Sequence, residues 1–197
     1  MKKLICTILC LLVCFATYGQ TEETQHLTFK DIPIDGTPTA FGNKLKAIGF
    51  TFDFEDDQGA HWYQGAFAGY NNCNICVKYS QNLVYEIVVL FPECYSWNML
   101  NNSYQSLKNM LISKYGDPFA NEEKFENFPS YRNINDDNDK FQEVKNDHCV
   151  YYTVINNYVN GMGTIVLEIK TGTPRVGLHY IDYINNSAKD AAALNDL

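Results

Sequence analysis

The chain has 197 residues and a formal net charge of −8, from 23 acidic and 15 basic side chains. This length fits one domain, or two small halves that share a core. The acidic balance and the lack of a basic patch argue against binding to nucleic acid or to an anionic membrane surface, because both depend on Lys and Arg side chains.

The N-terminus has the layout of a secretory signal peptide. Lys2 and Lys3 precede an apolar run, and small residues stand three and one positions before Gln20. We therefore expect cleavage before Gln20, which would remove residues 1–19, and a secreted or periplasmic protein.

Two features argue against a membrane anchor. The apolar run at 4–16 is shorter than the roughly 20 residues that a bilayer requires, and no later stretch is apolar enough to cross a membrane. The bulky Val13 disfavours lipidation of Cys14, because a lipidated cysteine normally follows a small residue.

The first half of the remaining chain predicts one short helix among several strands. Residues 27–34 alternate as in a strand, and a helix follows from Pro38, with Thr37 as its N-cap and Gly49 as its stop. Its apolar stripe consists of Phe41, Leu45 and Ile48. Further strands are expected at 50–55, 61–69, 73–80 and 83–91, the last being apolar on both faces and therefore central.

The second half contains the clearest helix. Ser96 caps it, Gly116 and Pro118 end it, and its stripe consists of Leu100, Tyr104, Leu107, Leu111 and Tyr115. Residues 119–147 are polar and weakly periodic, which predicts a long loop with at most one short element. Three more strands are expected at 148–158, 163–171 and 175–184, with a turn at Asn160-Gly161 and a terminal helix from Asn185.

This order of elements predicts an α+β fold in which antiparallel strands carry helices on one face. Residues 20–197 would form a single domain. The segments 71–91 and 147–170 can be laid side by side with Cys73 over Cys149, which indicates two half-repeats, 26–118 and 119–197.

The arrangement resembles the helix-plus-antiparallel-sheet modules of secreted lactamase-inhibitor-like proteins and outer-membrane assembly factors. The stretches HLTFKDIPIDGT, LKAIGF, LKNMLISKYGDP and YIDYINNSAKDAAALNDL are also similar to an uncharacterised family of small secreted proteins from Gram-negative gut bacteria. The resemblance covers most of the chain after residue 19. It implies a secreted α+β fold and carries over no catalytic residue.

Cys73 and Cys76 form a C-x-x-C spacing, but within a predicted strand. Strand positions three apart point to opposite faces, so Cys73 should lie on the apolar face and Cys76 on the polar one. That geometry disfavours a redox pair and a shared metal. An exported protein would instead contain disulfides or buried thiols, and Cys73–Cys94 and Cys73–Cys149 are the open alternatives.

No other motif supplies a catalytic or metal-binding set. The histidines are isolated, no serine stands in a nucleophile elbow, and Lys140 stands where a calcium loop spaced by Asn135, Asp137 and Asp139 needs glycine. We therefore assign no catalytic residue, no cofactor and no metal ligand, and we disfavour an enzyme. A hydrolase with an unrecognised carboxylate pair stays open.

The segment HWYQGAFAGY contains the candidate ligand-binding residues Trp62, Tyr63 and Tyr70. Aromatic rings of this kind stack on sugars or anchor protein partners, although strand packing alone also explains them. The pattern favours a non-enzymatic secreted or periplasmic module that binds an unknown protein or envelope component. Binding of a carbohydrate or small ligand through surface aromatics is the alternative.

Overall fold

The computed structural model describes residues 25–126, 134, 136–157 and 162–195. The predicted signal peptide with Cys14, and the predicted turn at Asn160-Gly161, lie outside the described residues. No helix in the described part of the chain is long and apolar enough to cross a membrane.

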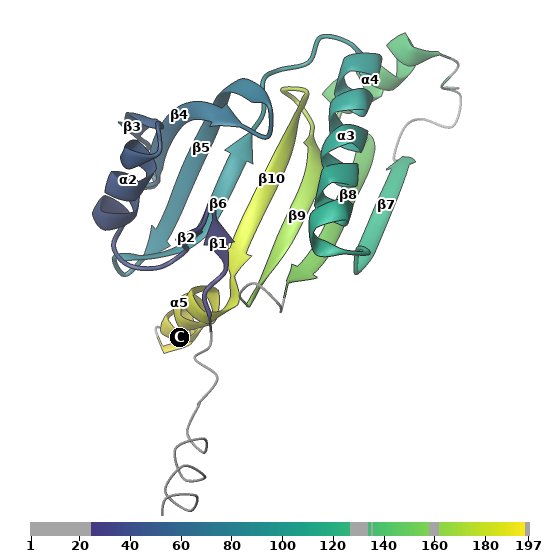
Figure 1. Ribbon diagram of the computed structural model, residues 1–197. Helices are drawn as coiled ribbons and strands as arrows, with labels where there is room; N and C mark the ends of the chain where they lie inside the picture. The colour runs from purple at the N-terminus through teal and green to yellow at the C-terminus, as the bar shows by residue number, and fades with distance from the viewer. Residues whose placement is uncertain (1–24, 127–133, 135, 158–161, 196–197) are drawn as a thin grey trace, which may run out of the picture.

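An eight-stranded antiparallel sheet forms the centre of the fold, with the order β3-β4-β5-β6-β10-β9-β8-β7 (Figure 1). Its strands are β3 (Thr51–Glu55), β4 (His61–Phe67), β5 (Tyr70–Ser80), β6 (Leu83–Leu90), β7 (Ala120–Phe125), β8 (Cys149–Asn157), β9 (Gly163–Lys170) and β10 (Arg175–Asp182). As its sequence predicts, β6 lies in the middle of the sheet, between β5 and β10.

Helices α2 (Pro38–Ala47) and α3 (Trp97–Tyr115) cover the two halves of one face of this sheet (Figure 1). α2 packs on β3, β5 and β6, and α3 packs on β8, β9 and β10. The α+β class with helices packed against an antiparallel sheet is thus confirmed. Thr37 and Ser96 cap the two helices as expected, by accepting hydrogen bonds from the backbone N–H groups of Ala40 and Met99.

The hydrophobic core fills the space between these helices and the sheet. Phe41 and Leu45 of α2 and Tyr104 of α3 are fully buried there. Ile48, which we expected on the same stripe as Phe41, is instead 42% exposed, because α2 ends at Ala47 and the chain turns away. The hydroxyl of Tyr104 finds a partner inside the core, Thr153 Oγ1, at 2.9 Å.

The prediction of a single strand at 27–34 is wrong. The segment forms a small hairpin of β1 (Thr28–Phe29) and β2 (Ile32–Pro33), which lies on the helix side of the sheet between α2 and α3 (Figure 1). The turn residues Lys30 and Asp31 have φ angles of 48° and 64°. Such positive φ values at both turn positions are typical of a two-residue hairpin, which alternation alone does not reveal.

The long loop predicted at 119–147 is also wrong, since the segment contains β7 and the helix α4 (Asp137–Lys145). The sequence of β7 is typical of a loop because β7 is an edge strand with a charged surface. On this surface Lys124 pairs with Glu122 and Glu126 at 2.7 Å each. The aspartates of the calcium-like spacing, Asp137 and Asp139, lie in the first turn of α4, where negative charge suits the helix dipole. The expected terminal helix is present as α5 (Tyr183–Asn195).

Each helix on the sheet precedes a run of four strands. α2 precedes β3 to β6, α3 precedes β7 to β10, and the final strands of the two runs pair at the centre. In this order Cys73 lies on the third strand of the first run and Cys149 on the second strand of the other. The alignment of Cys73 over Cys149 therefore does not follow the strand order, and the two half-repeats stay a prediction.

Candidate functional site

The second face of the sheet carries the candidate site, and we call it the open face. The strand registers align six residues in one row across it: Trp62, Cys76, Val88, His179, Val166 and Val154. None of these residues belongs to the core under α2 and α3. Trp62, Val166 and Val154 are partly exposed, so the row is an apolar track interrupted by one histidine.

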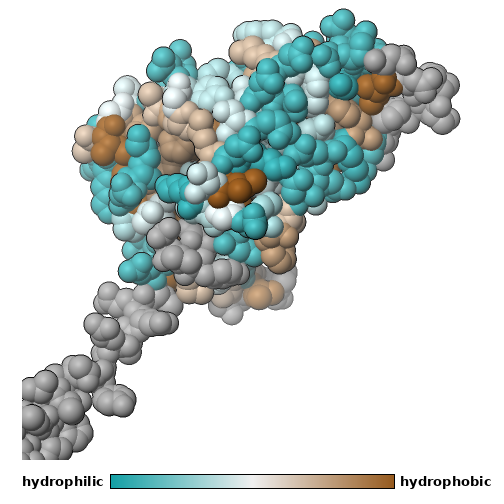
Figure 2. Space-filling model, turned by 45° about the vertical axis from the view of Figure 1, so that its right-hand side comes forward, coloured by the Kyte–Doolittle hydropathy of each residue, from teal (hydrophilic) through white to brown (hydrophobic). Residues whose placement is uncertain are grey.

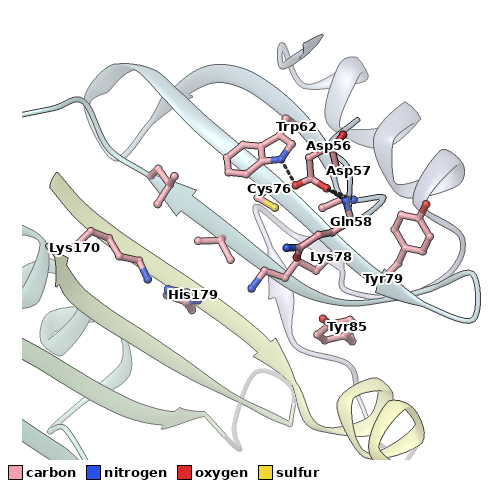
Figure 3. A pocket seen from close by; sticks show the side chains of 13 residues that line it. Asp56, Asp57, Gln58, Trp62, Cys76, Lys78, Tyr79, Tyr85, Lys170 and His179 are labelled. Carbon is pink, nitrogen blue, oxygen red and sulfur yellow. Dashed lines mark hydrogen bonds between the residues drawn. The ribbon is translucent and has the colours of Figure 1, made fainter. Parts of the chain in front are cut away.

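A groove of about 510 Å³ occupies the β4 end of this row. The loop after β3 forms one wall with Asp56, Asp57 and Gln58, and the floor comes from β4, β5 and β6. Figure 3 shows Trp62, Lys78, Lys170 and His179 on the same side of the sheet, although they come from four different strands.

Trp62 is held in a fixed orientation in this groove. Its indole N–H donates to Asp56 Oδ2 at 2.8 Å, and its ring stacks on Phe54 with centroids 5.8 Å apart. The other oxygen of Asp56 accepts from the backbone N–H groups of Gln58 and Ala60, which closes the loop. The hydrogen bond from Trp62 is the largest of the effects that lower the pKa of Asp56.

The stacking of Phe54 on Trp62 depends on an irregularity in β3. Residues two apart in a regular strand share a face, so Phe52 and Phe54 should lie together. The register shifts between Phe52 and Glu55, and as a result Phe52 contacts Tyr63 on the helix side while Phe54 reaches Trp62 on the open face.

Of the three aromatic candidates, the structure brings only Trp62 into the groove. Tyr63 is 3% exposed and points under α2, where its hydroxyl lies against Gly42. Tyr70 packs edge-on against Phe91, with ring centroids 5.1 Å apart, next to the core. The alternation of strand side chains separates Trp62 from Tyr63, even though they are neighbours in the sequence.

A chain of five charged groups crosses the middle of the open face. His179 bonds through Nδ1 to Glu86 Oε1 at 2.7 Å and through Nε2 to Glu168 Oε1 at 2.8 Å. Lys78 pairs with the second oxygen of Glu86 at 2.9 Å, and Lys170 pairs with Glu168. A neutral imidazole donates from one nitrogen only, so two carboxylate partners indicate that His179 is the imidazolium.

The electrostatics agree with this assignment. Burial by itself would lower the pKa of His179, but the hydrogen bonds to Glu168 and Glu86 outweigh it and raise the pKa above its usual value. Burial opposes ionisation of Glu168 as well, yet the hydrogen bonds from His179 and Lys170 lower its pKa to about 2. The pKa of Glu86 is lowered in the same way, by the hydrogen bonds from His179 and Lys78. The network therefore holds all three groups in their charged forms.

Sequence reasoning missed this network. The segment 83–91 is apolar on both faces except for Glu86, which stands in its middle. A charged residue inside an apolar strand is a signal for a buried partner. Its partner His179 lies 93 residues further along the chain, and only the pairing of β6, β10 and β9 brings Glu86, His179 and Glu168 together.

The C-x-x-C pair is split as predicted. Cys73 belongs to the core on the helix side, while Cys76 lines the groove on the open face. All four described cysteines are buried free thiols, so neither Cys73–Cys94 nor Cys73–Cys149 is formed. Burial raises the pKa of Cys73 to about 11 and that of Cys76 to about 12.

The order of strands explains why Cys73 and Cys149 do not pair. Three strands separate β5 from β8 in the sheet. At about 4.8 Å per strand the two lie roughly 19 Å apart, whereas a disulfide needs Cα atoms about 6 Å apart. Within the described residues, no group of three or more His, Cys, Asp or Glu side chains is arranged to hold a metal ion.

Comparison with known proteins does not assign the chain to a family. No family model matches the chain, and neither a curated protein nor a solved structure is significantly similar to it. The resemblance to the gut-bacterial family therefore stays a prediction.

Proposed function

We propose that this chain is an exported, non-enzymatic binding module whose open face docks a protein partner. The observation that carries the proposal is the row on that face, in which Trp62, Val166 and Val154 are partly exposed and Trp62 is held rigidly at one end. Rigid, partly exposed aromatic residues are the usual anchors of protein interfaces.

The charged groups on the open face fit the same role. The cores of interfaces are depleted of unpaired charge, because burying an isolated charge is costly. His179, Glu86 and Glu168 are already bonded to one another and to lysines, so a partner could cover them without leaving a carboxylate or imidazolium unpaired.

The size of the face also favours a protein. The row from Trp62 to Val154 crosses five strand-to-strand steps, or roughly 24 Å. A standard interface covers about 800 Å² on each partner, which corresponds to a patch of comparable width. A small ligand would occupy only the groove at one end.

A carbohydrate in that groove is the second candidate. Trp62 stands beside Asp56, Asp57 and Gln58, the combination of an aromatic ring and polar side chains that sugars require. The hydrolase alternative receives no support from Glu86 and Glu168, because a catalytic acid needs a raised carboxyl pKa and both of these are lowered.

Site-specific photo-crosslinking in the native host tests the proposal. A photoreactive residue at Val166 should yield one discrete crosslinked protein, and Trp62→Ala should reduce its yield at least fivefold. The matched control is the same photoreactive residue at Met110, which is 50% exposed on α3. Equal crosslinking from both positions, or none from Val166, would refute docking on the open face.

The export that we propose has its own test. Mass spectrometry of the protein from the periplasm or the medium should show an N-terminus at Gln20. Full-length protein in the cytoplasm would contradict export and leave the docking surface to be tested separately.

A further inference from the structure

A second cavity lies on the opposite side of the sheet, independent of the open face. It is a cleft of about 230 Å³ between α3, the β1–β2 turn and the β4–β5 turn, and β10 forms its floor. Its apolar walls consist of Phe67, Leu107, Met110, Leu111, Leu178 and Tyr180.

The polarity of this cleft differs from that of the groove. Two lysines, Lys30 and Lys114, line it, and no Asp or Glu does. Neither ammonium group forms an ion pair within the described part of the chain, while each lies over an aromatic ring: Lys30 at 5.5 Å from the Phe50 centroid, and Lys114 at 4.9 Å from that of Tyr115. In a chain with a net charge of −8, this is a local excess of positive charge beside an apolar cavity.

Lys30 belongs to the turn of the β1–β2 hairpin. Lys30 and Asp31 both adopt positive φ at the β1–β2 turn, a conformation that favours glycine or asparagine. These are the values of a two-residue hairpin turn, and Gln81 and Asn82 share them at the turn between β5 and β6. The turn thus brings Lys30 into the lining of the same cleft as Lys114 of α3.

The surface around the cleft is not a broad hydrophobic patch. On the face in Figure 2 the hydrophobic residues gather mainly at the α2–β3 edge, and elsewhere they form isolated spots among hydrophilic residues. The exposed residues Ile48, at the end of α2, and Phe52, in β3, do not line the cleft. A narrow apolar cavity within a polar surface fits a small molecule better than a protein.

We propose that this cleft binds a single-chain carboxylate amphiphile of the medium-chain fatty acid class. The alkyl chain would lie against the apolar walls, and the carboxylate would lie between the ammonium groups of Lys30 and Lys114. The cavity corresponds to about eight water volumes of 30 Å³, which limits the chain to a short or medium length.

Calorimetric titration of the full chain with sodium decanoate tests the site. One equivalent should bind, and the affinity should increase about fourfold per methylene from hexanoate toward decanoate until the cleft is full. The variant Lys30→Gln/Lys114→Gln should weaken decanoate about tenfold, because it removes both charged donors. It should leave decanol, which has no charge, nearly unchanged.

The matched control is Lys46→Gln/Lys145→Gln. These lysines also lie over aromatic rings, Phe52 at 5.6 Å and Phe141 at 4.7 Å, but they line no part of the cleft. This variant should bind decanoate like the wild type. Amide resonances of Ala68, Leu111 and Leu178 should shift on binding, and those of Trp62 and Val166 should not.

Several results would overturn the proposal. They are the absence of saturable binding at roughly 1 mM decanoate, an equal loss in the control variant, or shifts confined to the open face. Co-sedimentation with phosphatidylglycerol vesicles that depends on Lys30 and Lys114, without binding of free decanoate, would assign the lysines to a membrane surface instead.

Discussion

The charged network at the centre of the open face makes a pH-dependent prediction for His179→Gln. The imidazolium of His179 donates two charge-assisted hydrogen bonds, at 2.7 and 2.8 Å, and its side chain is 15% exposed. A glutamine keeps at most one donor group and carries no charge. Since a hydrogen bond to a charged group contributes about 1.5–3 kcal/mol, the variant should lose about that much unfolding free energy at pH 5.5.

The sign of the pH dependence follows from the direction of the pKa shift. The pKa of His179 is raised in the folded state, so its stabilisation is complete below its unfolded value of 6.5 and is lost as the pH rises through the folded pKa. The pKa of Glu168 is lowered to about 2, so its contribution is present above 4.5 and is lost as the pH falls toward 2. At pH 5.5 both contributions operate, whereas the imidazolium loses its charge as the pH rises through the folded pKa of His179, and the cost of His179→Gln should then fall to about 1 kcal/mol or less.

Urea denaturation of both proteins at pH 5.5 and pH 9 provides the measurement. The control is His61→Gln, because the His61 side chain is also 15% exposed but has one ion-pair partner, the exposed Glu55, at 3.5 Å. His61→Gln should cost less than His179→Gln at pH 5.5, because an ion pair with an exposed carboxylate contributes little. A cost of His179→Gln that does not fall at all as the pH rises from 5.5 would show that the imidazolium network is not formed.

Three further predictions concern buried residues. Gly42→Ala should destabilise the protein by about 1–3 kcal/mol despite the better helix propensity of alanine, because its Cβ would lie 1.8 Å from the Tyr63 hydroxyl; a rise in the urea midpoint would contradict this contact. Tyr104→Phe should cost about 1 kcal/mol in the same assay, since it removes the buried bond to Thr153, and an unchanged midpoint would count against that bond. The buried thiols should resist iodoacetamide at pH 8 in the folded protein and react after denaturation, as peptide mapping can show; rapid labelling of the folded state would contradict their burial and raised pKa values. They are Cys73, Cys76, Cys94 and Cys149.

The errors of sequence reasoning have a common cause. At β7 and at the β1–β2 hairpin, a short element is stabilised by a neighbour that the local pattern does not contain. β7 is polar along its length and becomes a strand by pairing with β8, with Phe125 opposite Cys149 and Ala120 opposite Val154. Periodicity detects an element that buries its own apolar side, and it overlooks an edge strand that buries little.

Part of the candidate site could be predicted from the sequence and part could not. Trp62 could be named from the sequence, because an aromatic residue in a strand is a candidate anchor wherever the strand lies. Its separation from Tyr63 follows from strand alternation alone. Its stacking on Phe54 could not be predicted, since that contact depends on the register shift in β3.

The sequence by itself determined the α+β class, the two capped helices with their apolar stripes, and the placement of Cys73 and Cys76 on opposite faces. These features depend on residues a few positions apart, where helix and strand geometry dictate which side chains share a face. Only the tertiary structure decided that β6 pairs with β10, and thus that Glu86, His179 and Glu168 meet on the open face. That contact depends on which distant strands become neighbours, and the packing of the whole core selects the pairing and its register.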